Sequence, residues 1–137
     1  MNQISIFLEN KYGRLNEILS FLAASKVRVI AATVADTSDY GILRLITSNQ
    51  QETYSLLKEN GVSASLSPVL VIATAPDTAS FAETIAHFTK AGIDIDYMYC
   101  FSLGEKVAIV LRTKNTDAAH DVVRKNGLDY IDESDLI

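Results

Sequence analysis

The chain has 137 residues, of which 48% are hydrophobic and 21% are charged, and its formal net charge is −5. This composition supports a packed core and excludes a largely disordered chain, while the negative charge and the absence of a Lys/Arg cluster exclude a nucleic-acid track. The sequence has no apolar run of about 18 residues that would span a membrane, no secretion signal and one cysteine, so we expect a cytoplasmic protein without an internal disulfide.

The first half of the chain predicts the element order βαββαβ. Strands are expected at 3–8, 27–36, 40–47 and 62–67, and helices at 14–25 and 50–60. The helices are indicated by apolar residues at i, i+4 and i+7, and the strands by short apolar segments separated by turns.

The second half repeats the same order of patterns. Strands are expected at 68–74, 93–103, 106–113 and 128–132, and helices at 79–91 and 115–126. Two helix-ending signals, "KENG" at 58–61 and "RKNG" at 124–127, lie 66 residues apart. Glycine directly after a basic helix end is typical of a left-handed C-cap. The same offset also places Glu17 on Glu83, which indicates a duplicated unit.

The repeat therefore predicts an α+β protein of two tandem ferredoxin-like units, residues 1–67 and 68–137. The segment "SLSP" at 65–68 is the expected seam. In each unit, helices are expected on one face of an antiparallel sheet.

A short segment at the first strand–helix junction resembles a known family. The residues "ENKYGRL" at 9–15, with "KVRVI" at 26–30 and "GIDID" at 92–96 at the start of the second strands, are similar to the ACT domain. Two tandem copies of that domain cover the whole chain, as in the small stand-alone tandem ACT proteins of bacteria. Tyr12 stands where the family often has proline.

The resemblance implies a regulatory protein that binds an amino acid and has no cofactor. In the family, two units pair their second strands into one antiparallel sheet, and the ligand lies between the first loop of one unit and the second strand of the other. Carried over to this chain, the site comprises Asn10, Lys11, Tyr12, Gly13, Arg14, Leu15, Asp94 and Asp96. A second site would comprise Asp77, Thr78, Ala79 and Arg28.

The chemistry of the first junction fits this role. Unpaired amides at a helix N-terminus favour a carboxylate, Gly13 permits close approach to the backbone, and Asn10 offers both a donor and an acceptor. The simpler interpretation is that Asn10 and Gly13 only form a turn. The second loop has Ala79 in place of glycine, which would reach the same backbone angles only with strain. We therefore expect the first loop to bind, while Asp77 and Thr78 cap the helix of the second.

Other chemistry-bearing residues form no recognisable constellation. His87 and His120 lack partner ligands for a metal, and Cys100 lies in an apolar strand where a structural thiol is expected. Strand alternation would put Asp94 and Asp96 on one face and the aromatic residues Tyr97, Tyr99 and Phe101 on the other, under the helices.

Three functional classes follow from these observations. The first is an amino-acid-binding regulatory module, and the second an enzyme of ferredoxin-like fold, which the missing catalytic constellation disfavours. The third is a non-catalytic assembly subunit of an amino-acid biosynthetic enzyme, such as a small subunit of the acetolactate synthase type. Because both faces of the predicted strands are largely apolar, we also expect a homodimer or larger assembly, with bare sheet faces packed together.

Overall fold

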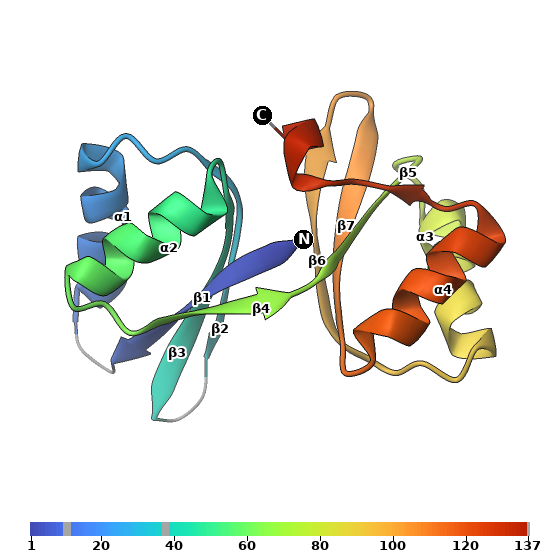
Figure 1. Ribbon diagram of the computed structural model, residues 1–137, viewed down its shortest axis with the longest axis horizontal. Coiled ribbons are helices and arrows are strands. Elements are labelled where there is room, and N and C mark those ends of the chain that lie inside the picture. The colour runs from blue at the N-terminus through green and yellow to red at the C-terminus, as the bar shows by residue number, and fades with distance from the viewer. Residues whose placement is uncertain (10–11, 37–38, 137) are drawn as a thin grey trace. The chain divides into compact units, whose positions relative to one another are not determined.

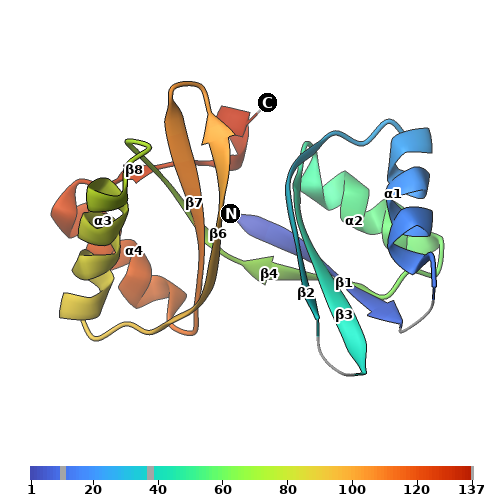
Figure 2. The same cartoon turned by 180° about the vertical axis from the view of Figure 1, so that it is seen from behind.

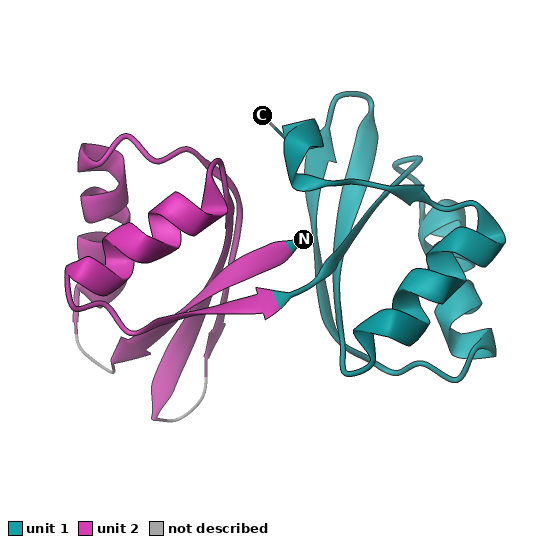
Figure 3. Cartoon of the chain, viewed as in Figure 1, with its two compact units in different colours: residues 1, 68–137 teal, residues 2–67 magenta. Residues whose placement is uncertain are grey.

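The computed structural model describes residues 1–9, 12–36 and 39–136 (Figure 1). The chain divides into two compact units (Figure 3). We call Asn2–Ser67 the N-terminal unit, and Pro68–Ile137 together with Met1 the C-terminal unit.

The N-terminal unit has the order βαββαβ. Its elements are β1 (Asn2–Glu9), α1 (Arg14–Ala24), β2 (Val29–Asp36), β3 (Tyr40–Thr47), α2 (Gln50–Glu59) and β4 (Ala64–Pro68).

The C-terminal unit repeats this order and adds a short 3-10 helix. Its elements are β5 (Leu70–Thr74), α3 (Thr78–Lys90), β6 (Ile95–Leu103), β7 (Lys106–Thr113), α4 (Thr116–Asn126), β8 (Asp129–Tyr130) and η1 (Glu133–Leu136). The predicted α+β class and the duplicated ferredoxin-like order are thus confirmed. No helix among the described residues is long and apolar enough to cross a membrane.

The strands form two four-stranded sheets, ordered β2-β3-β1-β4 and β6-β7-β5-β8. The expectation of one continuous sheet is therefore wrong. In each unit the first strand pairs with the third strand on one side and the last strand on the other. β2 and β6 are consequently the terminal strands of their own sheets.

Each sheet carries two helices on one face (Figure 2). Apolar side chains fill the space between them. In the N-terminal unit, Ile18 and Leu22 of α1 pack with Ile4 and Ile6 of β1. In the C-terminal unit, the central helix residue is Phe88, which is fully buried. Burial of one such side chain contributes roughly 1.5–3 kcal/mol, so these contacts are the main source of each unit's stability.

The second strand of each unit contains a register shift. The shifts lie between Val29 and Ala31 in β2 and between Ile95 and Tyr97 in β6. A bulge of this kind adds a residue to one strand and breaks the strict alternation of side chains.

The bulge in β6 reverses the predicted faces of that strand. Met98 pairs with Leu111 and Cys100 with Ile109, and both partners belong to the core under the helices. Tyr97, Tyr99 and Phe101 therefore lie on the sheet face away from the helices, where the sequence analysis expected the opposite. Alternation alone gave the wrong answer because it assumed an unbroken strand.

The apolar positions at the centre of that second face are also buried. Val71, Ala73, Ala108 and Val110 are at most 6% exposed. The expected homodimer or larger assembly stays a prediction.

Glycines end helices where the two "NG" signals predicted. Gly61 follows α2 with φ 73°, and Gly127 caps α4 with φ 60°. Both adopt the left-handed conformation of a helix C-terminus.

Candidate functional site

The first helix of the N-terminal unit begins without a side-chain cap. Its N-cap residue is Gly13, with φ 83° and ψ 0°, and no side chain there accepts a hydrogen bond from the helix. The Gly13 carbonyl oxygen accepts a bond of 3.0 Å from the Glu17 amide. Because the first amides of a helix have no intrahelical acceptor, this end of α1 can still donate to an external anion.

The space beside Gly13 is open. A Cβ built on Gly13 would meet no atom within 4 Å, yet its φ of +83° strains any residue with a side chain. Tyr12 next to it is fully exposed, and Leu15 is 36% exposed. The backbone at this turn is therefore accessible to a ligand.

Arg14 adds a cation to this helix start. One terminal nitrogen, Nη1, donates to Glu17 Oε2 at 3.2 Å, and the Arg14 side chain retains 21% exposure. Its Nε is buried and has no hydrogen-bond partner among the described residues. A buried donor without a partner is costly, so a ligand acceptor at this position would gain a strong, charge-assisted bond. Asn10 and Lys11, which the sequence analysis also placed in the site, lie outside the described residues.

The first helix of the C-terminal unit begins differently. Asp77 is its N-cap, and one carboxylate oxygen, Oδ1, accepts a bond of 2.7 Å from the Ser80 amide. The other oxygen, Oδ2, accepts a bond of 3.0 Å from the Ser80 hydroxyl. The protein's own carboxylate thus already occupies this helix end, as predicted for a cap.

The expected strain at Ala79 is absent. Thr78 and Ala79 both lie within α3, and the described residues with positive φ that are not glycine are Lys26 and Asn49. The 66-residue offset places Thr78, the first residue of α3, on Tyr12, whereas α1 begins only at Arg14. Relative to the repeat, α3 therefore starts two residues earlier than α1. The two loops therefore differ in where the helix begins, which a one-to-one comparison of residues does not reveal.

The remaining predicted site residues, Asp94, Asp96 and Arg28, belong to other segments of the chain than the two helix starts. Asp94 and Asp96 are both exposed, and the bulge at Ile95–Tyr97 interrupts the alternation that would align them. Asp94 lines a small pocket of about 250 Å³ at the end of α3. Arg28 precedes β2 and is exposed. Their joint use with the first loops stays a prediction.

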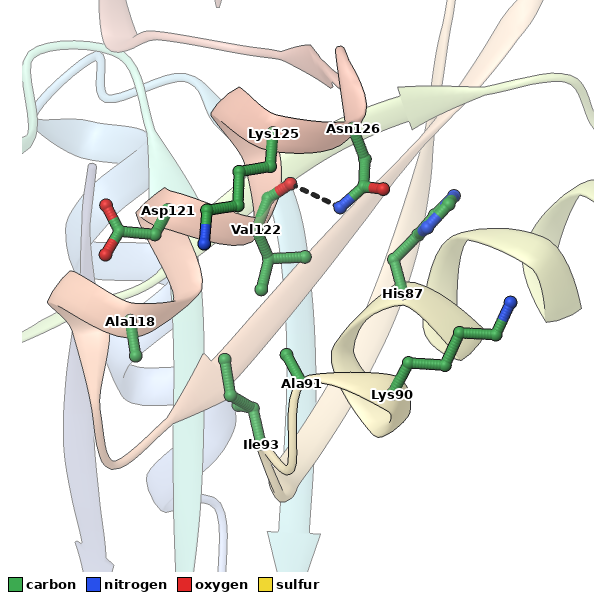
Figure 4. Close-up of a pocket in the computed structure, with 9 residues that line it drawn as sticks. All are labelled: His87, Lys90, Ala91, Ile93, Ala118, Asp121, Val122, Lys125 and Asn126. Atoms are coloured by element: carbon green, nitrogen blue, oxygen red, sulfur yellow. Dashed lines mark hydrogen bonds between the residues drawn. The ribbon is translucent and has the colours of Figure 1, made fainter.

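A larger groove of about 390 Å³ lies between α3 and α4 (Figure 4). Its charged side chains include Lys90 and Lys125, which belong to the last turns of their helices. Cations at helix C-termini are favoured by the helix dipole, and Asp121 in the same groove is paired with Arg124. Interactions that stabilise α3 and α4 thus account for the charged residues of this groove.

No metal or nucleophile site appears in the parts of the chain that are described. No group of three or more His, Cys, Asp and Glu residues there can hold a metal ion. Burial raises the pKa of the Cys100 thiol, which disfavours the thiolate that a nucleophile needs.

Comparison with known proteins gives the family. The sequence matches the family described as an ACT domain pair over residues 1–137. This chain belongs to the ACT domain pair family. The match confirms the resemblance seen at "ENKYGRL".

Solved structures agree with this assignment. The ACT pair is 33% identical to protein BT0572 from Bacteroides thetaiotaomicron, with a TM-score of 0.91 over 98% of this chain and 94% of that chain. It also shares its fold with the ligand-free regulatory subunit of aspartate kinase from Thermus thermophilus, at 14% identity and a TM-score of 0.62. The same subunit from Thermus flavus has 18% identity and a TM-score of 0.54. Both comparisons cover 90% of each chain. No curated protein matches the sequence.

Proposed function

We propose that this ACT pair binds a free amino acid at the start of α1 and regulates an enzyme of amino-acid biosynthesis. In this role the protein is non-catalytic and works in the cytoplasm. The ligand's α-carboxylate accepts hydrogen bonds from the amides near Gly13 and from Arg14.

The observation that carries this proposal is the pairing of two unsatisfied donors at one helix start. The N-terminus of α1 has no side-chain cap, and the buried Nε of Arg14 has no partner in the described part of the chain. A carboxylate supplies acceptors to both kinds of donor and complements the positive end of the helix dipole.

The ammonium of the ligand needs a negative or carbonyl group. We assign this role to Asn10 and Asp94, with Asp96 as a further carboxylate, on the ACT resemblance. The enzyme partner rests on the shared fold with regulatory subunits of aspartate kinase. The kinase itself is not implied.

The proposal is tested by a thermal-shift screen of the twenty common amino acids followed by calorimetry. Binding to the folded state adds about 2.7 kcal/mol of stability at a concentration 100 times Kd, so a true ligand raises Tm measurably. We expect micromolar affinity, which corresponds to about −8 kcal/mol, and one ligand per chain at this site.

Gly13→Val separates this site from a simple turn. Valine strains the left-handed turn and fills the open space beside the backbone, so calorimetry should detect no binding. Ala79→Val in α3 is the matched control and should leave affinity unchanged. Wild-type affinity in Gly13→Val would contradict the site, and no response to any amino acid would favour the assembly-subunit role.

We also propose that the ACT pair is a homodimer that uses the helix side of its edge strands. Val34 of β2 is 48% exposed and Met98 of β6 is 40% exposed. Beside Met98, a largely apolar groove of about 720 Å³ runs along α3. Terminal strands with apolar neighbours favour pairing with another chain. Light scattering at micromolar concentration should report a dimer, and a monomer there would contradict this assembly.

A further inference from the structure

A second pocket lies in the N-terminal unit, between the end of α1 and the start of α2. Its volume is about 260 Å³, slightly below the roughly 300–1,000 Å³ of pockets that hold drug-sized ligands. It is lined by Ser25, Lys26, Val27, Ser48, Asn49, Glu52, Thr53 and Leu56. The pocket suits a molecule of about the size of an amino acid.

Opposite charges line this pocket without forming an ion pair. Lys26 and Glu52 are both exposed. Neither takes part in a salt bridge with another described residue. Val27 and Leu56 supply apolar surface, and Ser25 and Ser48 supply hydroxyl groups. The lining thus offers a cation, an anion and a partly apolar wall to one small molecule.

Lys26 occupies a position where stability alone favours glycine. Its amide donates to Ala23 O and the following amide, of Val27, donates to Leu22 O, while Lys26 has φ 61°. The C-terminal unit makes the same two bonds at the end of α3, with Gly92 in the left-handed position. A lysine in this conformation is strained relative to glycine. The C-terminal unit therefore has the less strained residue, glycine, at the position where the N-terminal unit has Lys26.

Asn49 differs from its repeat partner in a related way. Asn115 caps α4 through a bond of 3.0 Å from the Ala118 amide to its Oδ1. Asn49 lies at the same position before α2, has φ 50° and makes no such cap. Its side chain is therefore not engaged in capping, in a residue that lines the pocket.

From these observations we propose that the pocket between α1 and α2 binds a small zwitterion, with Lys26 facing its carboxylate and Glu52 its ammonium. A free amino acid is the simplest molecule of this class. Charge-assisted bonds from opposite ends of the ligand would fix its orientation. This site is separate from the start of α1 and does not depend on the function proposed above.

The test is a nuclear magnetic resonance titration of the full chain, labelled with nitrogen-15, with each of the twenty common amino acids at millimolar concentration. At least one amino acid should shift the amide signals of Lys26, Ser48, Asn49 and Glu52, and should do so equally in Gly13→Val. Its N-acetyl and amide derivatives each lack one charge and should bind about ten-fold more weakly, equivalent to 1.4 kcal/mol.

Matched variants separate charge from backbone. Lys26→Gln and Glu52→Gln should each weaken binding about ten-fold or more, while Lys58→Gln, at the far end of α2, should not. Lys26→Gly should abolish the shifts and yet raise Tm by about 2–5 °C, because it relieves the left-handed strain. The proposal is overturned if no amino acid shifts these signals, or if both charge variants bind with wild-type affinity.

Discussion

The starts of α1 and α3 differ in how their first backbone amides are capped. Both helices follow the first strand of a ferredoxin-like unit, and both need acceptors for their first amides. In α3 the Asp77 carboxylate accepts from the Ser80 amide at 2.7 Å. In α1 the N-cap is Gly13, which has no side chain to offer.

This difference separates two units that otherwise share the same order of elements. The C-terminal unit caps the Ser80 amide of this helix with its own carboxylate. The N-terminal unit leaves donors available, which is a cost to its own stability and an opportunity for an anion. The same contrast recurs at Lys26 and Gly92, where again the N-terminal unit has the less stable choice. Two units of the same fold therefore differ in the caps at their helix ends.

The largest expected effect tests what the two units share. Leu22 and Phe88 are equivalent core positions, and both are at most 1% exposed. Phe88→Ala should lower the free energy of unfolding by about 3–5 kcal/mol and Leu22→Ala by about 2–5 kcal/mol, through lost burial and a cavity. Urea denaturation measures both, with Val34→Ala as an exposed control. A loss below 1 kcal/mol at either core position would break the equivalence.

The next effect tests the donors at α1. Arg14→Gln removes the cation and its Nε, so amino-acid affinity should fall by about 10–100-fold, the equivalent of one charge-assisted bond. Arg124→Gln removes an exposed arginine of α4 and serves as the control. Calorimetry with the amino acid found by the thermal-shift screen checks this. Equal affinities in the two variants would show that Arg14 takes no part in binding.

A smaller effect tests the cap of α3. Asp77→Ala leaves the Ser80 amide without its acceptor and should lower stability by about 1 kcal/mol. Ligand affinity at α1 should not change. Asp77→Asn keeps an oxygen acceptor and should recover most of the loss in thermal unfolding. If Asp77→Ala instead weakened binding, the two helix starts would not be functionally distinct.

The smallest effect concerns a surface contact of the C-terminal unit. Lys106 Nζ lies 3.0 Å from Asp129 Oδ2, and the two side chains are 59% and 50% exposed. Solvent screens such pairs, so Lys106→Ala should change the free energy of unfolding by roughly 0.2–1 kcal/mol. Added salt should remove even this difference, as urea denaturation at low and high ionic strength would reveal. A salt-independent loss would point to packing by the lysine stem instead.

The sequence predicted the fold well because its signals are local and repeated. Helical spacing and the two glycine ends located α1–α4 to within about two residues, the usual uncertainty of helix boundaries. The 66-residue repeat then supplied the topology. The cap at Asp77 followed from its residue type alone.

The errors came from features that have no local signature. The bulge at Ile95–Tyr97 leaves no mark in the apolar pattern, yet it moved Tyr99 and Phe101 to the other face. Ala79 was read as a strained turn because the repeat offset hid the earlier start of α3. The pocket of Lys26 and Glu52 brings together separate segments, which only a structure reveals. The amino-acid site at Gly13 remains a prediction.

The two bulges occupy equivalent positions in the two units. They lie at Val29–Ala31 in β2 and at Ile95–Tyr97 in β6, one repeat length apart. The extra residue at the matched position gives both second strands the same change of phase. Deleting Asp96 would remove the extra residue and exchange the inner and outer residues of the part of β6 that follows it. The two units thus share a strand that is turned over at the same position, whereas the starts of their first helices differ.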